Sequence, residues 1–369
     1  MSQNNSTLKF SIIKLKFIEP IALSSERDDD YIKDVNSIPS DTLKAALISA
    51  FAEVSTNQIE INEFNEHLIV SSAFPFINDL YFFPKPQLSI QNYIEKSQNQ
   101  NQNQNDFELK YRKKLKKVKF IEKNVLEKII SGTKLYFDEI INFNDFESIA
   151  LKSPISSNTN YPSKIYVSET IERVSLGCKP YLDIPHSEKG DPYYFTRTHF
   201  FQSDKYSTGL WFAWQSNQAD VIKINDCLLN ALELLKNNGI GADKSIGHGK
   251  FEFEVATIEL NYPSDFSHII NLSKFLPSEK EFQNISLENS MYNLSLCGGY
   301  IAGSSDHSKR HWIRKYVWMF DEGSILKFNN QSETEKIIFG KNVIALNSSS
   351  LPHQVFRDGR SIFLPIKLS

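Results

Sequence analysis

Residues 238–253 (NGIGADKSIGHGKFEF) are the part of this sequence that most restricts the fold. Four glycines fall within eleven positions, between a segment with helical leucine spacing (226–236) and an alternating, strand-like segment (250–260). A glycine-rich connection lets the backbone approach another group closely. Because Lys244, His248 and Lys250 are interspersed with the glycines, we expect that group to be anionic.

The two best-known nucleotide-binding patterns do not fit this loop. The P-loop pattern needs a second glycine five positions after the first. Here the residue five positions after Gly239 is Lys244, and the residue five positions after Gly241 is Ile246. The dinucleotide pattern G-x-G-x-x-G fails because Lys244 occupies its third glycine position. Both patterns also require the order strand, loop, helix, whereas here the loop follows a helical segment and precedes a strand-like one. Two interpretations remain open: an anion-binding cradle, and a flexible loop in which Gly239 caps the preceding helix.

Composition excludes several classes of protein. The length of 369 residues favours about two domains, and a net charge of −3 excludes a globally basic nucleic-acid binder but not a local basic groove. The three cysteines are far apart without a C-x-x-C pair, which argues against a disulfide framework and a cysteine zinc site. The N-terminus resembles no signal peptide, and no window has about 18 consecutive apolar residues. We therefore expect a cytoplasmic protein with no membrane contact.

The order of strong elements predicts an α+β fold. We expect a strand at 8–18, a helix at 41–54, strands near 164–172 and 208–215, a helix at 226–236 and a strand at 250–260. This βαββαβ order is ferredoxin-like (RRM-like). It predicts a first domain over 1–260, with an insertion at about 60–160 and the glycine-rich loop 238–250 before its last strand. Residues 261–369 are expected to form a smaller, β-rich, second ferredoxin-like domain.

The predicted insertion contains two notable segments. Residues 71–86 combine aromatic residues with prolines, and we favour core and turn material over a base-stacking platform. Residues 110–123 concentrate basic side chains, among them Lys113, Lys114, Lys116 and Lys117. This run could be a solvated helix face or an arm. We favour phosphate contact, because like charges this dense repel one another unless an anion neutralises them.

Several stretches together resemble the RAMP superfamily of CRISPR effector proteins. ALELLKNNGIGADKSIGHGKFEF matches the superfamily's glycine-rich loop with its flanking helix and strand, and PSDTLKAALISAFAEV resembles its first helix. SSAFPFINDLYFFPKP followed by KKLKKVKFI, then VWMFDEGSIL and PHQVFRDGRSIFLPI, resemble further motifs in the same order. The set covers nearly the whole chain and is most similar to the Cas-five-like subunit of the type III-A (Csm) complex, which caps the 5′ end of the crRNA. Departures occur at Ala242 for glycine, Asp243 for a basic residue, His248 for an aromatic and Lys250 for arginine.

This resemblance implies a non-catalytic, RNA-binding subunit without a cofactor or metal. It would hold the repeat-derived 5′ handle of the crRNA and contact the large polymerase-type subunit and the first backbone RAMP subunit. The implied RNA contacts are the loop and a thumb-like hairpin with Arg173 on its loop, together with the lysine run: Gly239, Gly241, Lys244, Ser245, Gly247, His248, Gly249, Lys250, Arg173, Lys113, Lys114, Lys116 and Lys117.

Two other functions stay open from the sequence. Some relatives in the superfamily cut precursor RNA, and a nuclease needs a general acid and base near the scissile phosphate. His248 is the only candidate in the loop, and we favour a structural or stacking role for it. Alternatively, the aromatic content of 12% fits a scaffold that contacts only proteins. His307 and His311 lie four apart, but the adjacent Lys309 and Arg310 favour a basic loop over a metal site.

Overall fold

The computed structural model describes residues 5–23, 35–55, 57–88, 94–95, 118–133, 135–136, 150–151, 165–175, 191–217, 221–299, 301, 312–329, 338–347 and 354–368. The lysines at 113, 114, 116 and 117, the histidines at 307 and 311 and the Asn/Gln-rich stretch at 97–106 therefore lie outside the described residues.

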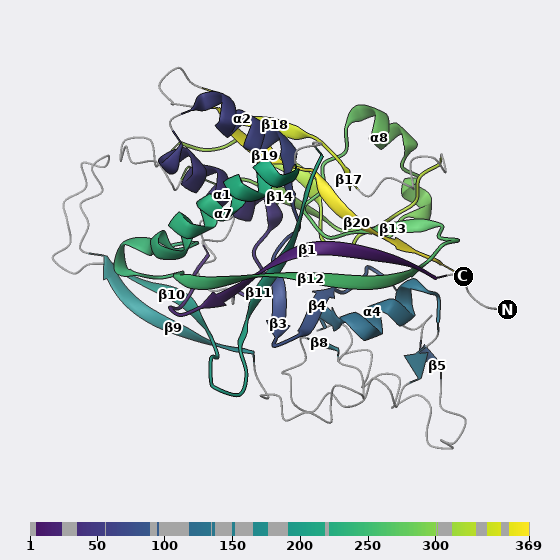
Figure 1. The fold of residues 1–369 in the computed structure, drawn as a ribbon, viewed down its shortest axis with the longest axis horizontal. Coiled ribbons are helices and arrows are strands. Elements are labelled where there is room, and N and C mark those ends of the chain that lie inside the picture. Colours follow the sequence, from purple (N-terminus) through teal and green to yellow (C-terminus); the bar gives the residue numbers. More distant parts are fainter. Residues whose placement is uncertain are drawn as a thin grey trace.

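A large, mainly antiparallel sheet organises the fold (Figure 1). The first and last strands of the expected βαββαβ unit are neighbours, and the sheet then continues beyond the strands of that unit. Its strand order is β12 (Phe251–Pro263), β1 (Asn5–Phe17), β11 (Thr208–Ser216), β3 (Phe74–Ile77), β4 (Leu80–Pro84), β6 (Phe120–Glu122) and β8 (Ala150–Leu151), with β2 (Leu68–Val70) also paired to β11.

One predicted strand does not belong to this sheet. The segment near 164–172 forms β9 (Tyr166–Ser175), which pairs with β10 (Asp191–Phe200) in a separate two-stranded ribbon. The place beside β11 is taken by β2 and β3, which lie in the predicted insertion. The position beside β11 requires a strand that is buried on both faces. Every residue of β2 and β3 is buried, whereas Glu169 and Glu172 of β9 are exposed.

Strand β1 is buried on both faces over its central part. Phe10 and Ile12 point to one face of the sheet, and Ile13 and Leu15 point to the other. All four are at most 1% exposed. In the sequence, the apolar positions change parity near Ile12, which predicts either a bulge or burial on both faces. The pairing of β1 with β12 runs without interruption from Asn5 to Phe17, so the strand is buried on both faces and has no bulge there.

Three helices gather on one side of β1 and β12 (Figure 1): α1 (Ser40–Val54), α2 (Gln58–His67) and α7 (Val221–Asn238). Polar residues ahead of apolar helical stripes predict N-caps at Ser40 and Asp226, and both predictions are wrong. Helix α7 begins five residues before Asp226, and Pro39 precedes α1 while the Ser40 hydroxyl accepts a hydrogen bond from the Lys274 amide at 2.9 Å. Elsewhere, α4 (Lys123–Ile130) packs against β4, β6 and β12.

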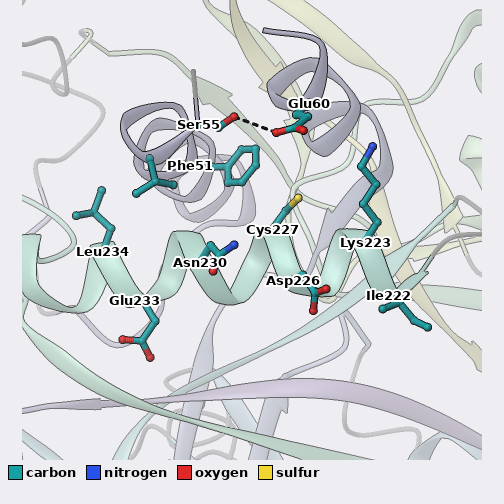
Figure 2. A pocket seen from close by; sticks show the side chains of 11 residues that line it. Phe51, Ser55, Glu60, Ile222, Lys223, Asp226, Cys227, Asn230, Glu233 and Leu234 are labelled. Carbon is teal, nitrogen blue, oxygen red and sulfur yellow. Dashed lines mark hydrogen bonds between the residues drawn. The ribbon is translucent and has the colours of Figure 1, made fainter. Parts of the chain in front are cut away.

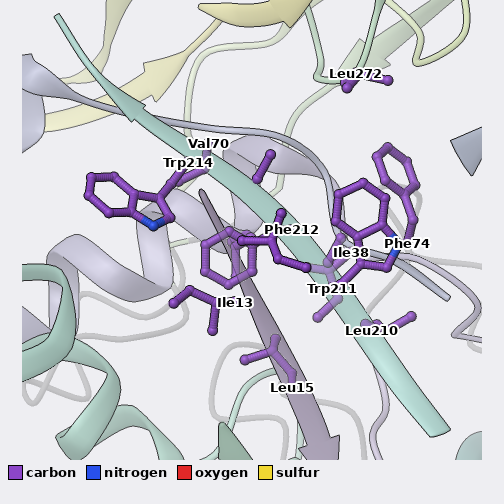
Figure 3. Close-up of a cluster of buried hydrophobic side chains, with 14 of the residues drawn as sticks. Ile13, Leu15, Ile38, Val70, Phe74, Leu210, Trp211, Phe212, Trp214 and Leu272 are labelled. Carbon is purple, nitrogen blue, oxygen red and sulfur yellow. The ribbon is translucent and has the colours of Figure 1, made fainter. Parts of the chain in front are cut away.

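The aromatic segment 71–86 is core, as favoured from the sequence. Trp211 is fully buried and its indole nitrogen donates to the Phe82 carbonyl at 3.0 Å. The rings of Phe74, Tyr81 and Phe83 surround it at centroid distances of 5.7, 5.8 and 4.8 Å. Figure 3 shows Phe74 of β3 beside Trp211 of β11, with Phe212, Ile13 and Leu15 nearby. These rings are unavailable for base stacking because they fill the interior.

The C-terminal part is β-rich, as expected. Its sheet has the order β16 (Ile325–Leu326), β13 (His268–Asn271), β20 (Ser361–Ile366) and β17 (Ile338–Phe339), and β14 (Leu294–Cys297) pairs with β15 (Val317–Phe320) and β18 (Asn342–Leu346) with β19 (Val355–Asp358). Among the described residues after β12, α8 (Glu279–Asn284) is the one α-helix, so a second ferredoxin-like unit is not recognisable. The remaining strand pair is β5 (Ile94–Glu95) with β7 (Leu135–Tyr136).

The two parts of the chain share one core. Leu272, Ile325, Ile362 and Leu364 belong to the same buried cluster as the central strands and the faces of α1 and α7. A smaller cluster around Phe275, Phe320 and Phe363 belongs to the C-terminal part alone. The domain boundary near 260 remains a prediction from the sequence.

Candidate nucleic-acid interface

The glycine-rich loop connects the end of α7 to the start of β12, as the sequence predicts. Gly239 has φ +80° and its amide donates to the Leu235 carbonyl at 2.8 Å, so it ends α7 in the left-handed conformation. The segment that follows β1 accepts backbone hydrogen bonds from the loop. The amide of Ala242 donates to the Ala22 carbonyl at 2.7 Å, and that of Gly249 donates to the Pro20 carbonyl at 2.8 Å. These hydrogen bonds therefore attach the base of the loop to the segment that follows β1.

Three of the four glycines are required by this internal packing. A Cβ at Gly239 would lie 2.3 Å from the His248 carbonyl oxygen, one at Gly241 2.2 Å from that of Ala22, and one at Gly249 2.0 Å from that of Ile240. All three also have positive φ, which disfavours any other residue. Their presence follows from the loop's own fold and needs no ligand.

Gly247 differs from the other three. It has φ +95°, yet a Cβ placed on it would meet no heavy atom within 4 Å. It follows a short 3₁₀ turn, η2 (Lys244–Ile246), whose residues are exposed. This tip, Lys244–Gly247, therefore leaves space for a ligand at the backbone and presents one ammonium group beside it.

His248 does not belong to the exposed tip. It is 5% exposed, and its ring lies at 6.0 Å and 27° from that of Phe195 on β10. Lys250 is half-buried, and its carbonyl accepts hydrogen bonds from the amide of Ile18 at 3.0 Å. Of the three basic side chains in the loop, Lys244 is thus the one that the fold exposes.

The β9–β10 ribbon joins the loop through Phe195. Arg173, expected on a hairpin loop, instead lies within β9, opposite Tyr193 of β10; its side chain is outside the described residues. Within the ribbon, Arg197 of β10 donates a hydrogen bond to Glu169 of β9 at 3.0 Å. This contact lowers the pKa of the Glu169 carboxyl group. The ribbon and the glycine loop are therefore neighbours, whereas the lysine run lies outside the described residues.

A second group of basic residues, in the motif VFRDGR, was missed as a structural element by sequence reasoning. Arg357 is 1% exposed and forms an ion pair with Asp41 at the start of α1, and its other nitrogen donates to the Gly298 carbonyl at 2.8 Å. Lys44 of α1 is likewise buried and pairs with Asp358. The detectable signal was the presence of charged residues between two apolar runs.

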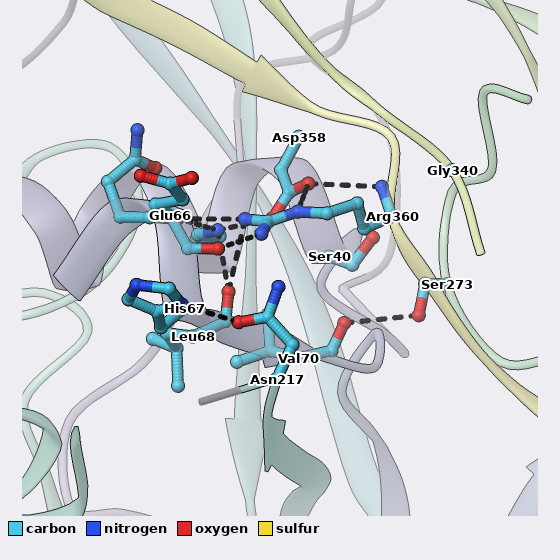
Figure 4. A network of polar contacts seen from close by, with 12 residues as sticks. Ser40, Glu66, His67, Leu68, Val70, Asn217, Ser273, Gly340, Asp358 and Arg360 are labelled. Carbon is cyan, nitrogen blue, oxygen red and sulfur yellow. Dashed lines mark hydrogen bonds and ion pairs between the residues drawn. The ribbon is translucent and has the colours of Figure 1, made fainter. Parts of the chain in front are cut away.

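Arg360 completes this buried cluster (Figure 4). It bonds to Asp358 at 2.9 Å and donates to the Asn65 carbonyl at 2.7 Å, at the end of α2. Although burial opposes ionisation, Lys44 and Arg360 hold the pKa of Asp358 below its usual range. Because these cations are already matched inside the protein, the cluster binds α1 and α2 to the C-terminal strands and offers no site for phosphate.

Other functional sites find no support in the described parts of the chain. Within them, no group of three or more His, Cys, Asp or Glu side chains is arranged to hold a metal ion. Nor does any of the helices described have the length and apolar character needed to cross a membrane.

Comparisons with known proteins give a sequence match to the C-terminal part of the chain and a fold match to nearly all of it. Residues 264–366 match the family model for the CRISPR Csm4 C-terminal domain. A chain in the crystal structure of the Csm3–Csm4 subcomplex of the type III-A CRISPR-Cas interference complex has a TM-score of 0.62 at 16% identity, covering 98% of this chain and 100% of that chain. A chain in the Csm1–Csm4 cassette with cA4 has a TM-score of 0.56 at 16% identity, covering 98% of each. No curated protein matches in sequence. The fold is thus shared over nearly the full length.

Proposed function

We propose that this chain, a Csm4-like RAMP subunit, is the RNA-binding subunit of a type III-A Csm complex that holds the 5′ handle of the crRNA. The C-terminal family match and the full-length fold match support membership in such a complex, since Csm4 is the component common to both kinds of matched subcomplex. We further infer that residues 1–260 are the ferredoxin-like RAMP domain, because the first and last strands lie side by side.

The open tip of the glycine loop is the observation that carries the RNA assignment. Gly247 has free space around its α-carbon, and the neighbouring Lys244 and Ser245 are exposed. RNA phosphates bind to exposed backbone and to cationic side chains, and single-stranded segments can also be read by shape and stacking. The adjacent β9–β10 ribbon, with Arg173, supplies the thumb-like second contact in this proposal, and Lys113, Lys114, Lys116 and Lys117 add positive charge.

The proposed protein partners are a large polymerase-type subunit and a backbone RAMP subunit. Relatives with this fold were solved as Csm1–Csm4 and Csm3–Csm4 subcomplexes, which supports both neighbours. Catalysis is not part of the proposal. A nuclease would need His248 close to the scissile phosphate, and the burial of this ring against Phe195 argues against that role.

The test compares two lysine variants in handle binding. Lys244→Ala should weaken binding of a 5′-handle RNA oligonucleotide about tenfold at low salt, and the log–log salt slope should become shallower by about 0.7, the contribution of one phosphate contact on a single strand. Lys280→Ala on α8 is the matched control, because Lys280 is also exposed and lies in the C-terminal part. Fluorescence anisotropy over a salt series measures both values. Equal affinity and slope for Lys244→Ala and the unmodified protein would contradict the assignment.

A further inference from the structure

The helical side of the molecule carries a groove that the RNA proposal does not use. It has a volume of about 860 Å³ and lies between the end of α1, the start of α2 and the length of α7. Figure 2 shows Cys227 and Lys223 of α7 pointing toward α1 and α2, while Asp226 and Glu233 point from α7 to the side away from these two helices. The groove is lined by the same helix that ends at the glycine loop, but none of its lining residues belongs to that loop.

Apolar side chains are exposed in this groove. Val54 at the end of α1 is 50% exposed and Ile222 near the start of α7 is 75% exposed. Phe51, which is buried, and Leu234, which is half-buried, line the floor of the groove. Apolar residues grouped in a concave surface favour contact with another apolar surface, unlike single exposed residues scattered over a protein.

The rim of the groove is acidic. Its lining residues include the carboxylates Glu60, Asp226 and Glu233 but a single ammonium group, Lys223. Lys223 is paired with Glu63 at 2.6 Å, and Glu233 is paired with Lys236 at 3.0 Å. Burial, together with Glu60 and Asp226, raises the pKa of the Cys227 thiol, which agrees with a negative potential in the groove.

We infer that this groove binds a basic, amphipathic helix of a partner protein. An apolar floor with acidic rims matches a helix that presents apolar residues at i, i+3, i+4 and i+7 with Lys or Arg beside them. Ile222 and Leu234 are twelve positions apart on α7, which corresponds to about 18 Å and about three turns of a bound helix. The inference concerns a protein contact and holds whether or not the glycine loop binds RNA.

Two other occupants are disfavoured by the same charges. RNA would bring phosphates against three carboxylates. A second copy of this chain would, in a two-fold arrangement, place the same acidic rim on both sides of the contact. Opposite charge on the partner removes both conflicts.

Photo-crosslinking in the assembled complex tests this inference. p-Benzoylphenylalanine replaces Val54 in the groove or, as the control, Val255, which is 54% exposed on β12. After irradiation of the purified complex, mass spectrometry identifies the attached segment. The expected result at position 54 is a helix of another protein subunit with Lys or Arg beside apolar residues at helical spacing, and a different product or none at position 255. Crosslinks at position 54 to RNA, to a second copy, to an acidic segment, or to nothing would overturn it.

Charge reversal provides the second readout. Asp226→Lys with Asn230→Lys places two exposed lysines on α7 at i, i+4 and should reduce the position-54 crosslink at least tenfold. Glu279→Lys with Gln283→Lys makes the same change in charge at the same spacing on exposed positions of α8 and should leave the crosslink unchanged. The circular dichroism spectrum and the midpoint of thermal unfolding should match those of the unmodified protein in both variants, which shows that they are folded. An unchanged crosslink in the α7 variant would contradict the charge argument.

Discussion

Two segments of this chain combine glycine with basic side chains: the loop 239–250 and the turn at Arg357–Arg360. In the loop, Lys244 is exposed beside a glycine with free space around it. In the turn, Arg357 and Arg360 are at most 8% exposed, and each is paired with a buried carboxylate. The residue types are similar, but the loop exposes its lysine, whereas the turn pairs both arginines with carboxylates inside the protein. The comparison teaches that a basic, glycine-containing motif predicts phosphate binding only where its cations lack internal partners.

The largest expected effect is on the buried cluster. Arg357→Met should destabilise the protein by about 3–5 kcal/mol, because it leaves Asp41 as an uncompensated buried charge. Urea unfolding measures the loss. The double variant Asp41→Leu with Arg357→Met should be clearly less destabilised than the single one, since both charges are then removed. A double variant at least as unstable as Arg357→Met would show that the pair is not the source of the effect.

A smaller effect separates two glycines of the loop. Gly249→Ala should cost about 3 kcal/mol, since it combines an unfavourable φ with a Cβ 2.0 Å from the Ile240 carbonyl oxygen. Gly247→Ala has only the φ cost of about 1–2 kcal/mol, because no atom opposes the new methyl group. Thermal unfolding of both variants provides the comparison. Equal losses would mean that the loop tip is as tightly packed as its base.

The acid dependence of stability sharpens the account of the turn. The pKa of Asp358 is held below its usual value in the folded protein, so its contribution is fully present above pH about 4 and is lost as the pH falls toward the folded-state pKa. Asp358→Asn should be less stable at pH 7 but should lose less stability between pH 4 and 2.5 than the unmodified protein. Denaturant unfolding at each pH gives the two slopes. Identical slopes would contradict a lowered pKa at this carboxyl group.

How far these features could be read from the sequence depends on the range of the interactions. Helical and alternating patterns identified α1, α7, β1 and β12, since each depends on local periodicity. Strands β2 and β3 were missed because they are three and four residues long and Pro75 argued for a turn. The start of α7 was placed at Asp226, which hid Ile222 and the groove. The pairing of Lys44 with Asp358, 314 positions apart, leaves no local signal.

The loop shows the same limit. Its position between a helix and a strand followed from spacing, but the division of its four glycines into three packed ones and one open one did not. His248 was grouped with the lysines because it is basic, and its burial depends on Phe195 of the distant β10 strand.

The smallest expected effect concerns His248. His248→Phe should change handle-RNA affinity less than twofold, because the replacement ring can keep the contact with Phe195 and the side chain does not reach the exposed tip. Anisotropy titration beside Lys244→Ala gives the comparison. A loss as large as that of Lys244→Ala would place the imidazole at the RNA and remove the distinction between the tip and the base of the loop.

The most direct test of the central claim is crosslinking of the crRNA handle in the assembled complex. Handle nucleotides carrying 4-thiouridine are irradiated, and the attached peptides are identified by mass spectrometry. The predicted result is attachment within the glycine loop around Lys244–Gly247 and on the β9–β10 ribbon, with none at Arg357–Arg360. Crosslinks at the buried turn or on α7, with none in the loop, would contradict the assignment of this loop as the RNA-binding element.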